Sequence, residues 1–199
     1  MHEREGLDPL SPRPPGRDGP RERLLDTAYT LFSQEGIAAV GIDKIVAGSS
    51  VAKMTLYHQF SSKRGLVLAF LDLRHERWTC DWMKAEVERR ASTWPDRALA
   101  LLEIFDEWFH SEQFEGCSFT NTLMETRDPS SPVRIEAVRQ LELVREIIEG
   151  WAEQGGVSNA AEVAFQLQIL TLGAVVSATR GDLQACRRVR PIVESLVYP

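Results

Sequence analysis

Two short apolar stripes on either side of a break constrain the fold of this chain more than any other feature. Ile42 and Ile45 recur at helical spacing before the break Gly48–Val51, and Leu56 and Phe60 share one side of the run that follows. Two short helices joined by a turn of a few residues form a helix-turn-helix, whose second helix can enter the major groove of DNA. The stretch therefore predicts a DNA-binding motif.

The second run carries cationic, hydroxyl and aromatic groups on the side opposite its apolar residues. These groups belong to Lys53, Met54, Thr55, Tyr57 and His58. The helical period places Tyr57 on the same side as Lys53, which favours contact with a phosphate over a place in the core. Met54 is equally well interpreted as a contact to a thymine methyl group and as an ordinary surface residue.

An earlier apolar stripe predicts a helix that packs across this pair. Pro20 fits a first helical turn, and Gly36 is expected to end the helix in a left-handed conformation. With this brace, residues 20–65 make a three-helix DNA-binding head. Residues 1–19 are rich in Pro and Gly and predict a flexible arm, either a simple tail or a segment that reaches a minor groove.

The remainder, residues 66–199, shows helical periodicity almost throughout. Ser61–Arg64 is a capping signal for a long helix that reaches about Arg89, and Ser158 is expected to cap a later one. Further helices are expected over residues 95–110, 133–154, 158–178 and 183–196. The sequence therefore predicts an all-α fold of about nine helices, in which the long helix transmits movement between the two halves.

The last two helices predict a homodimer. The run after Ser158 is apolar nearly all the way round, and one chain of this size offers too few neighbours to cover it. Gly173 and Ala174 would permit another helix to approach closely. Two terminal helices from each of two chains would form a four-helix interface, and the dimer would carry the two heads that a palindromic operator requires.

The distribution of charge leaves a nucleic-acid partner possible despite a net charge of −6. Residues 1–64 contain nine Lys and Arg against eight Asp and Glu, which leaves 14 against 21 for the remainder. Because salt screens charges farther away than about 10 Å, the groups near a duplex decide binding. The acidic excess lies outside the predicted head.

Other classes of protein find little support in the sequence. No apolar run long enough for a membrane span and no apolar N-terminal signal segment is evident, which predicts a cytoplasmic protein. The three cysteines never form a CxxC pair, so a disulfide framework or zinc module is not expected. His75, Glu76 and Cys80 share a helix but lack a metal-binding spacing, and neither a metal nor a cofactor is expected.

Aromatic residues after residue 66 predict either a hydrophobic core or the lining of an apolar ligand pocket. The candidate lining residues are Trp82, Phe105, Trp108, Phe109, Phe119 and Met124, with Cys117 beside them and with Asn121, Glu125 and Gln166 as polar anchors. Cys117 is either a thiol sensor or inert. No basic residue adjoins it in sequence to activate the thiol, which favours the inert interpretation.

The residues of the head resemble a known family. Phe32–Gly36, Ile45, Ala52–Phe60 and Ser62–Lys63 together resemble the N-terminal signature of the tetracycline-repressor (TetR) family of bacterial regulators, and the TLYHxF core followed by SK is specific to it. The resemblance covers about 50 residues, while the remainder agrees only in its helical architecture. The segment GCSFTN at 116–121, together with Glu125, looks like one branch of that family.

The resemblance implies roles for individual residues. Lys53, Thr55, Tyr57 and His58 would face the groove or its phosphates, and Lys63 would contact a phosphate. The family often has Thr at positions 40 and 41, so Gly41 lacks a hydroxyl contact to phosphate. Ala52 stands where Ser commonly caps the recognition helix, a change that costs about 1 kcal/mol of helix stability.

We therefore expect a ligand-responsive homodimeric transcriptional regulator. It would act as a repressor that leaves double-stranded operator DNA when a small, largely apolar effector binds to residues 66–199. One alternative is a ligand-sensing helical protein that has lost DNA binding. The other is a small helical enzyme, which the absence of a converging nucleophile, base and orienting group disfavours.

Overall fold

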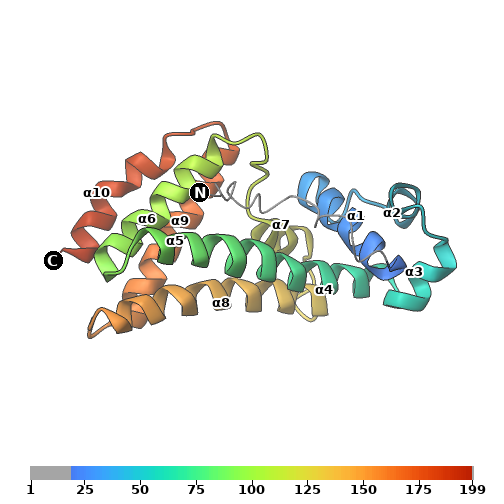
Figure 1. Ribbon diagram of the computed structural model, residues 1–199, viewed down its shortest axis with the longest axis horizontal. Coiled ribbons are helices and arrows are strands. Elements are labelled where there is room, and N and C mark those ends of the chain that lie inside the picture. Colours follow the sequence, from blue (N-terminus) through green and yellow to red (C-terminus); the bar gives the residue numbers. More distant parts are fainter. Residues whose placement is uncertain (1–18, 199) are drawn as a thin grey trace, which may run out of the picture. The chain divides into compact units, whose positions relative to one another are not determined.

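The computed structural model describes residues 19–198 (Figure 1). The predicted arm at 1–19 lies outside these residues except for Gly19. Every regular element between residues 19 and 198 is a helix. The elements are α1 (Pro20–Glu35), α2 (Ile42–Ser49), α3 (Lys53–Phe60), α4 (Lys63–Arg74), the π-helix η1 (His75–Lys84), α5 (Ala85–Arg90), α6 (Trp94–Phe109), α7 (Ser118–Glu125), α8 (Pro132–Gln154), α9 (Ala160–Thr179) and α10 (Ala185–Val197).

These elements confirm the all-α prediction. The run α4–η1–α5 is helical without interruption, and counting it once gives nine helices within residues 19–198. The described chain divides into two compact units. The first contains residues 19–78 and 118–140, and the second contains residues 79–117 and 141–198. The three boundaries along the chain fall inside η1, directly before α7 and inside α8.

The first unit is organised around α1, which packs against α2, α3 and α4. The ring of Phe70 on α4 meets Tyr29 and Phe32 of α1 edge-on, with centroids 5.8 and 5.4 Å away. Leu24, Ile45, Leu56 and Leu66 are fully buried in the same unit. The apolar stripes predicted from the sequence therefore form the core that supports the helix-turn-helix.

Both ends of α1 and the start of α4 can be compared with the helix start and stop signals predicted from the sequence. α1 begins at Pro20 as predicted, but the expectation of a left-handed Gly36 is wrong. Gly36 has a positive φ of 80°, but its ψ of 160° is that of extended backbone. The chain therefore becomes extended directly after α1 and does not form a left-handed turn. Ser62 caps α4 as predicted, since its hydroxyl accepts a hydrogen bond from the Gly65 N–H at 3.1 Å.

The turn between α2 and α3 begins later than the sequence indicates. Gly48 and Ser49 belong to α2, and Ser50 adopts the left-handed conformation that ends it. Gly48 is needed for close packing, because a Cβ atom there would lie 2.8 Å from Cγ2 of Thr27 on α1. The predicted break Gly48–Val51 is therefore corrected to a turn over residues 50–52.

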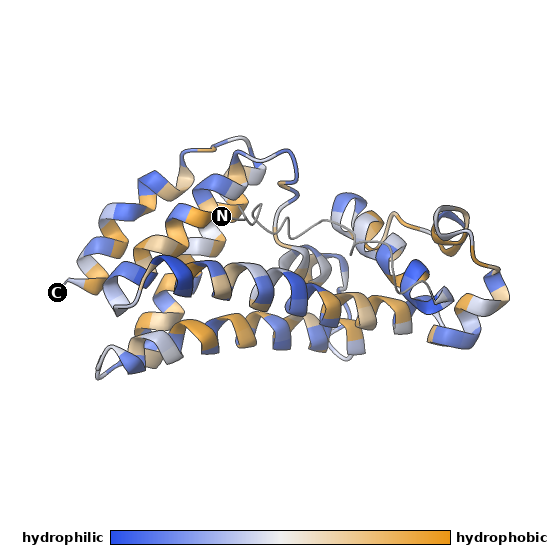
Figure 2. Ribbon diagram, in the orientation of Figure 1, coloured by the Kyte–Doolittle hydropathy of each residue, from blue (hydrophilic) through white to orange (hydrophobic). Residues whose placement is uncertain are grey.

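In the second unit, α6 packs against α5, α9 and α10, and α9 packs against α10 (Figure 1). Figure 2 shows hydrophobic and hydrophilic residues alternating along α6 and α10, as in amphipathic helices. Thr93 caps α6, but Ser158 does not cap α9. The N-terminal residue of α9 is preceded by Asn159, which makes no capping bond through its side chain.

The composition of α9 corrects one expectation. By length and mean hydropathy this helix is long and apolar enough to cross a membrane, although no such run was expected from the sequence. In the described chain, 44% of its most apolar 18-residue window is buried against other helices. A helix in the core of a folded unit can have the same length and hydropathy, because it too must be apolar on most sides.

Candidate nucleic-acid interface

The two sides of α3 have opposite character. Leu56 is fully buried and Phe60 is 7% exposed, so this side anchors α3 to the head. Met54 is 77% and Tyr57 40% exposed. Lys53 and His58 are exposed as well, and Thr55 is half-buried. The structure thus brings all five residues predicted for α3 to one short helix, and four of them face away from the core.

Neighbouring helices hold α3 in place although its cap is weak. Ala52 precedes α3 and makes no capping bond through its side chain, as its identity predicts. The Arg21 guanidinium of α1 lies 5.1 Å from the centroid of the Phe60 ring, a cation–π distance. This contact joins the end of α3 to the start of α1 and leaves a cation near the outer surface of the head.

The cations of the helix-turn-helix are engaged with carboxylates. Lys53 Nζ donates a hydrogen bond to Asp43 Oδ1 at 2.6 Å, and Lys44 is paired with Glu35. The Asp43 carboxylate raises the pKa of Lys53 above its ordinary value, so the ammonium stays charged. The predicted phosphate contact at Lys53 therefore has an internal partner that sequence reasoning missed.

Lys63 lies at the start of α4 and also has an internal partner. Its ammonium donates a hydrogen bond to the backbone carbonyl of Ile37 at 2.5 Å. Burial lowers the pKa of Lys63, and the negative charge of Glu125 opposes that shift. Lys63 thus joins α4 to the loop between α1 and α2, and a contact with phosphate would require its side chain to exchange partners.

Glu125 occupies a different setting from the pocket anchor that the sequence suggested. Its carboxylate accepts a hydrogen bond from the Ala38 N–H at 2.7 Å, which joins the end of α7 to the loop after α1. Gly36 makes room for this approach, since a Cβ atom there would lie 2.3 Å from Glu125 Oε1. In this structure Glu125 positions the loop before α2, and its role as a pocket anchor stays a prediction.

A buried arginine holds α4 against α1. Arg74 is 1% exposed and donates hydrogen bonds to Tyr29 Oη and Ser33 Oγ at 3.3 and 3.4 Å. Arg77 lies 2.5 Å from Asp26 in an ion pair to the same helix. Both contacts were missed from the sequence. In the sequence, Arg74 at the end of α4 and Arg77 in η1 look like ordinary solvated charges between apolar residues.

Gly41 immediately precedes α2 and is exposed, with open space around the position of a Cβ atom. Its carbonyl accepts hydrogen bonds from the N–H groups of Lys44 and Ile45. The backbone there starts the helix without a side-chain cap. Gly41 therefore offers only its backbone to a partner at this end of α2.

Four of the five aromatic residues predicted to line a pocket form a packed cluster in the second unit. Trp82, Phe105, Trp108 and Phe109 make ring contacts with one another or with Phe114, at centroid distances between 4.9 and 6.3 Å. Phe114 was missed because it follows α6 in a loop without periodicity. Cys117 is also buried. The structure brings these residues together as the core of the unit.

The remaining predicted pocket residues lie elsewhere. Phe119 is buried on α7 in the first unit. Asn121 and Met124 belong to α7 in the first unit, and both are exposed. Gln166 is exposed on α9, where its amide donates a hydrogen bond to Glu162 on the same helix at 2.8 Å. The structure does not place Gln166 in the aromatic cluster, and its role as an anchor stays a prediction.

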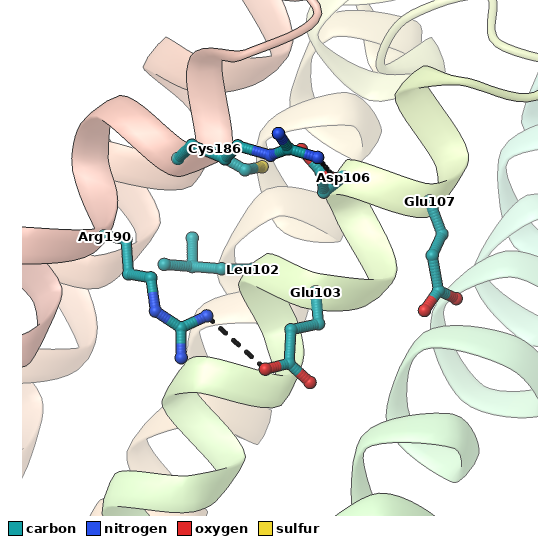
Figure 3. Close-up of a pocket in the computed structure, with 7 residues that line it drawn as sticks. Leu102, Glu103, Asp106, Glu107, Cys186 and Arg190 are labelled. Carbon is teal, nitrogen blue, oxygen red and sulfur yellow. Dashed lines mark hydrogen bonds and ion pairs between the residues drawn. The ribbon is translucent and has the colours of Figure 1, made fainter.

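A cavity of about 190 Å³ lies between α6 and α10 (Figure 3). Its lining includes Leu102, Glu103, Asp106, Glu107, Cys186, Arg187 and Arg190. Figure 3 shows Arg190 of α10 reaching toward Glu103 of α6, and their nearest charged atoms are 3.4 Å apart. Arg187 lies 3.7 Å from Asp106, and Glu107 pairs with Arg90 at 2.7 Å. The charges of this cavity therefore compensate one another and link the helices.

Part of the first unit is similar in sequence to known bacterial regulators. Residues 24–70 match the family model described as "Bacterial regulatory proteins, tetR family". The chain is 38% identical over 52 residues to the HTH-type transcriptional repressor KstR2 of Rhodococcus jostii, a match that covers 26% of each protein. It is 32% identical over 123 residues to the HTH-type transcriptional activator FasR of Mycolicibacterium smegmatis, covering 60% of this chain and 54% of FasR. These alignments thus span between a quarter and about half of the relatives' length.

A solved structure extends the likeness to almost the full chain. The crystal structure of a TetR-family transcriptional regulator from Streptomyces coelicolor is 28% identical in sequence and aligns with a TM-score of 0.74. The alignment covers 90% of this chain and 94% of that protein. The helices outside the head therefore follow the same fold as those of that regulator.

Proposed function

Since this chain belongs to the tetR family of bacterial regulatory proteins, we propose that it is a cytoplasmic DNA-binding transcriptional regulator and not an enzyme. It acts as a repressor that a small molecule releases from operator DNA. One observation carries the proposal: α3 buries Leu56 and Phe60 while it exposes Lys53, Met54, Tyr57 and His58. A helix held on one side and polar on the other is suited to enter a major groove.

The proposed contacts divide into two kinds. Met54, Thr55 and His58 face base edges, where an apolar side chain can touch a thymine methyl group and a hydroxyl can bond either base. Lys53 and Tyr57 contact phosphates, together with Lys63 and the backbone at Gly41. Lys53 exchanges Asp43, and Lys63 exchanges Ile37, for a phosphate oxygen when the head binds.

The proposed organisation assigns residues 20–65 to DNA binding and residues 66–199 to effector binding and dimerisation. The effector is largely apolar and binds near the aromatic residues of the second unit. Their clustered rings supply the apolar surface that such a ligand needs. An effector displaces the equilibrium only by binding more tightly to the conformation that does not fit the operator.

The proposed dimer forms through α9 and α10. Phe165, Ile169 and Val176 are each more than half exposed, and their spacing places them on one side of α9. Ile192 of α10 is also more than half exposed. An apolar stripe of this kind is stabilised by a second copy of itself across a two-fold axis. The resulting pair of heads matches a palindromic operator.

Binding to DNA tests the proposal directly. Operator sequences are selected from a random duplex library with the purified protein, and the affinity is measured by gel shift over a range of salt concentrations. Lys53→Ala and Tyr57→Ala should each weaken binding by about 1–3 kcal/mol. Lys84→Ala and Tyr198→Ala remove the same side chains from the second unit and should have no such effect. Failure to select any sequence, or affinity that does not depend on salt, would contradict the proposal.

A further inference from the structure

The ion pair between Asp43 and Lys53 lies on the exposed surface of the helix-turn-helix. Lys53 Nζ is 2.6 Å from Asp43 Oδ1, and the two side chains are 51% and 84% exposed. Asp43 belongs to the first turn of α2, where the helix dipole favours a carboxylate, and Lys53 is the first residue of α3. The contact therefore spans the turn that joins the two helices of the motif.

We propose that Asp43 limits the affinity of the head for DNA of arbitrary sequence, because its carboxylate competes with the phosphates for Lys53. This inference rests on the proposed function, because it requires α3 to approach a duplex. Asp43 would act through the ammonium of Lys53 and through its own charge. It needs no contact with a base.

Competition between two anions gives the physical reason. Affinity for arbitrary DNA comes almost entirely from cations that neutralise phosphates. Lys53 can contribute to that affinity only if its ion pair with Asp43 breaks. The unpaired Asp43 carboxylate then lies close to the phosphate backbone. This carboxylate and the phosphates repel one another, and because Asp43 is exposed, water and salt reduce that repulsion without removing it at short range. Lys53 therefore adds less to non-specific affinity than an unpaired lysine would.

A matching operator changes this balance. Base contacts made by α3 exist only on the correct sequence, and they offset the cost of separating Lys53 from Asp43. Non-specific binding has no such compensation. Operator binding therefore remains favourable at this cost, whereas binding to DNA of arbitrary sequence, which is already weak, becomes weaker still.

The experiment measures binding to a fluorescein-labelled 24-base-pair duplex of mixed sequence by fluorescence anisotropy between about 50 and 200 mM salt. The variants are Asp43→Asn, Asp43→Ser, Lys53→Ala and the double variant Asp43→Asn with Lys53→Ala. Glu153→Gln, an exposed carboxylate on α8 in the second unit, is the control for the loss of one negative charge. Thermal unfolding of each variant shows that the head remains folded.

Asp43→Asn and Asp43→Ser should bind this duplex about threefold to tenfold more tightly, with a salt dependence steeper by about one phosphate contact. The gain should disappear in the Lys53→Ala background and should be absent in Glu153→Gln. Affinities within twofold of the wild type, or an equal gain without Lys53, would overturn the role of Asp43 and leave the proposed function intact. Failure of the wild type to bind any DNA would overturn both the role of Asp43 and the proposed function.

Discussion

The carboxylate of Glu125 accepts a hydrogen bond from the backbone N–H of Ala38 at 2.7 Å, although 87 positions separate the two residues in the chain. The contact holds the loop between α1 and α2 against the end of α7. Lys63, at the start of α4, donates a hydrogen bond to the carbonyl of the neighbouring Ile37. The loop that leads into the helix-turn-helix is thus fixed from two helices, and its position affects how α2 and α3 meet a partner.

Replacing Gly36 at the start of this loop should destabilise the folded protein. Its φ of 80° with ψ of 160° lies in a region that is nearly exclusive to glycine, and a Cβ atom would displace the Glu125 carboxylate. Gly36→Ala should lower the free energy of unfolding by about 1–3 kcal/mol, measured by urea denaturation. Gly41→Ala is the matched control: its φ is −82° and no atom lies nearby, so its effect should stay within about 0.5 kcal/mol. Equal losses would contradict this account.

Removing the Glu125 side chain tests the same contact from the other end. Glu125→Ala should cost about 0.5–1.5 kcal/mol of stability, the usual value of one hydrogen bond. The cost should shrink in the Gly36→Ala background, because the carboxylate is already displaced there, and a double-mutant cycle measures this coupling. Met124→Ala, at the exposed neighbouring position, is the control. Additive effects of Gly36→Ala and Glu125→Ala would show that the two residues act independently.

The proposed dimer predicts that one charge on α9 separates the subunits. Ile169→Glu would place a carboxylate from each copy in an apolar interface, and burial of unpaired charges is costly. The dissociation constant of the dimer should rise by at least about 100-fold, measured by analytical ultracentrifugation. Met124→Glu makes the same kind of change on α7 and should leave the dimer intact. A monomeric wild type would contradict the proposed interface.

The sequence was sufficient for most of the fold because local periodicity determines where helices form. The stripes that include Leu24, Ile45 and Leu56 predicted α1, α2 and α3, and all three residues are fully buried. Gly48 misled the prediction of the turn, because glycine at a tight contact with Thr27 has the same appearance as glycine in a break. The π-helix η1 has no recognised pattern of residues and was not predicted.

The candidate site was only partly predictable, since its electrostatics depend on residues that are distant in the chain. The exposed side of α3 followed from the helical period, which places Lys53 and Tyr57 together. The partners of Lys53 and Lys63 could not be predicted in this way, because packing between elements determines which acceptor lies near each ammonium group. The hydrogen bond from the Ala38 N–H to the Glu125 carboxylate could not be predicted for the same reason, since it depends on how α7 packs against the loop after α1.

Cys186 should be the least reactive thiol of the described chain and should make stability sensitive to alkaline pH. Burial, assisted by the nearby Asp106 carboxylate, raises the pKa of Cys186 from 9.0 to about 12. The folded protein therefore retains the thiol proton between those values while the unfolded chain loses it, so stability should fall as pH rises above about 9. Cys186→Ala should remove this part of the pH dependence in urea titrations, whereas Cys80→Ala, at a half-exposed position, should not. Alkylation followed by mass spectrometry should label Cys80 before Cys186, and the reverse order would contradict the assignment.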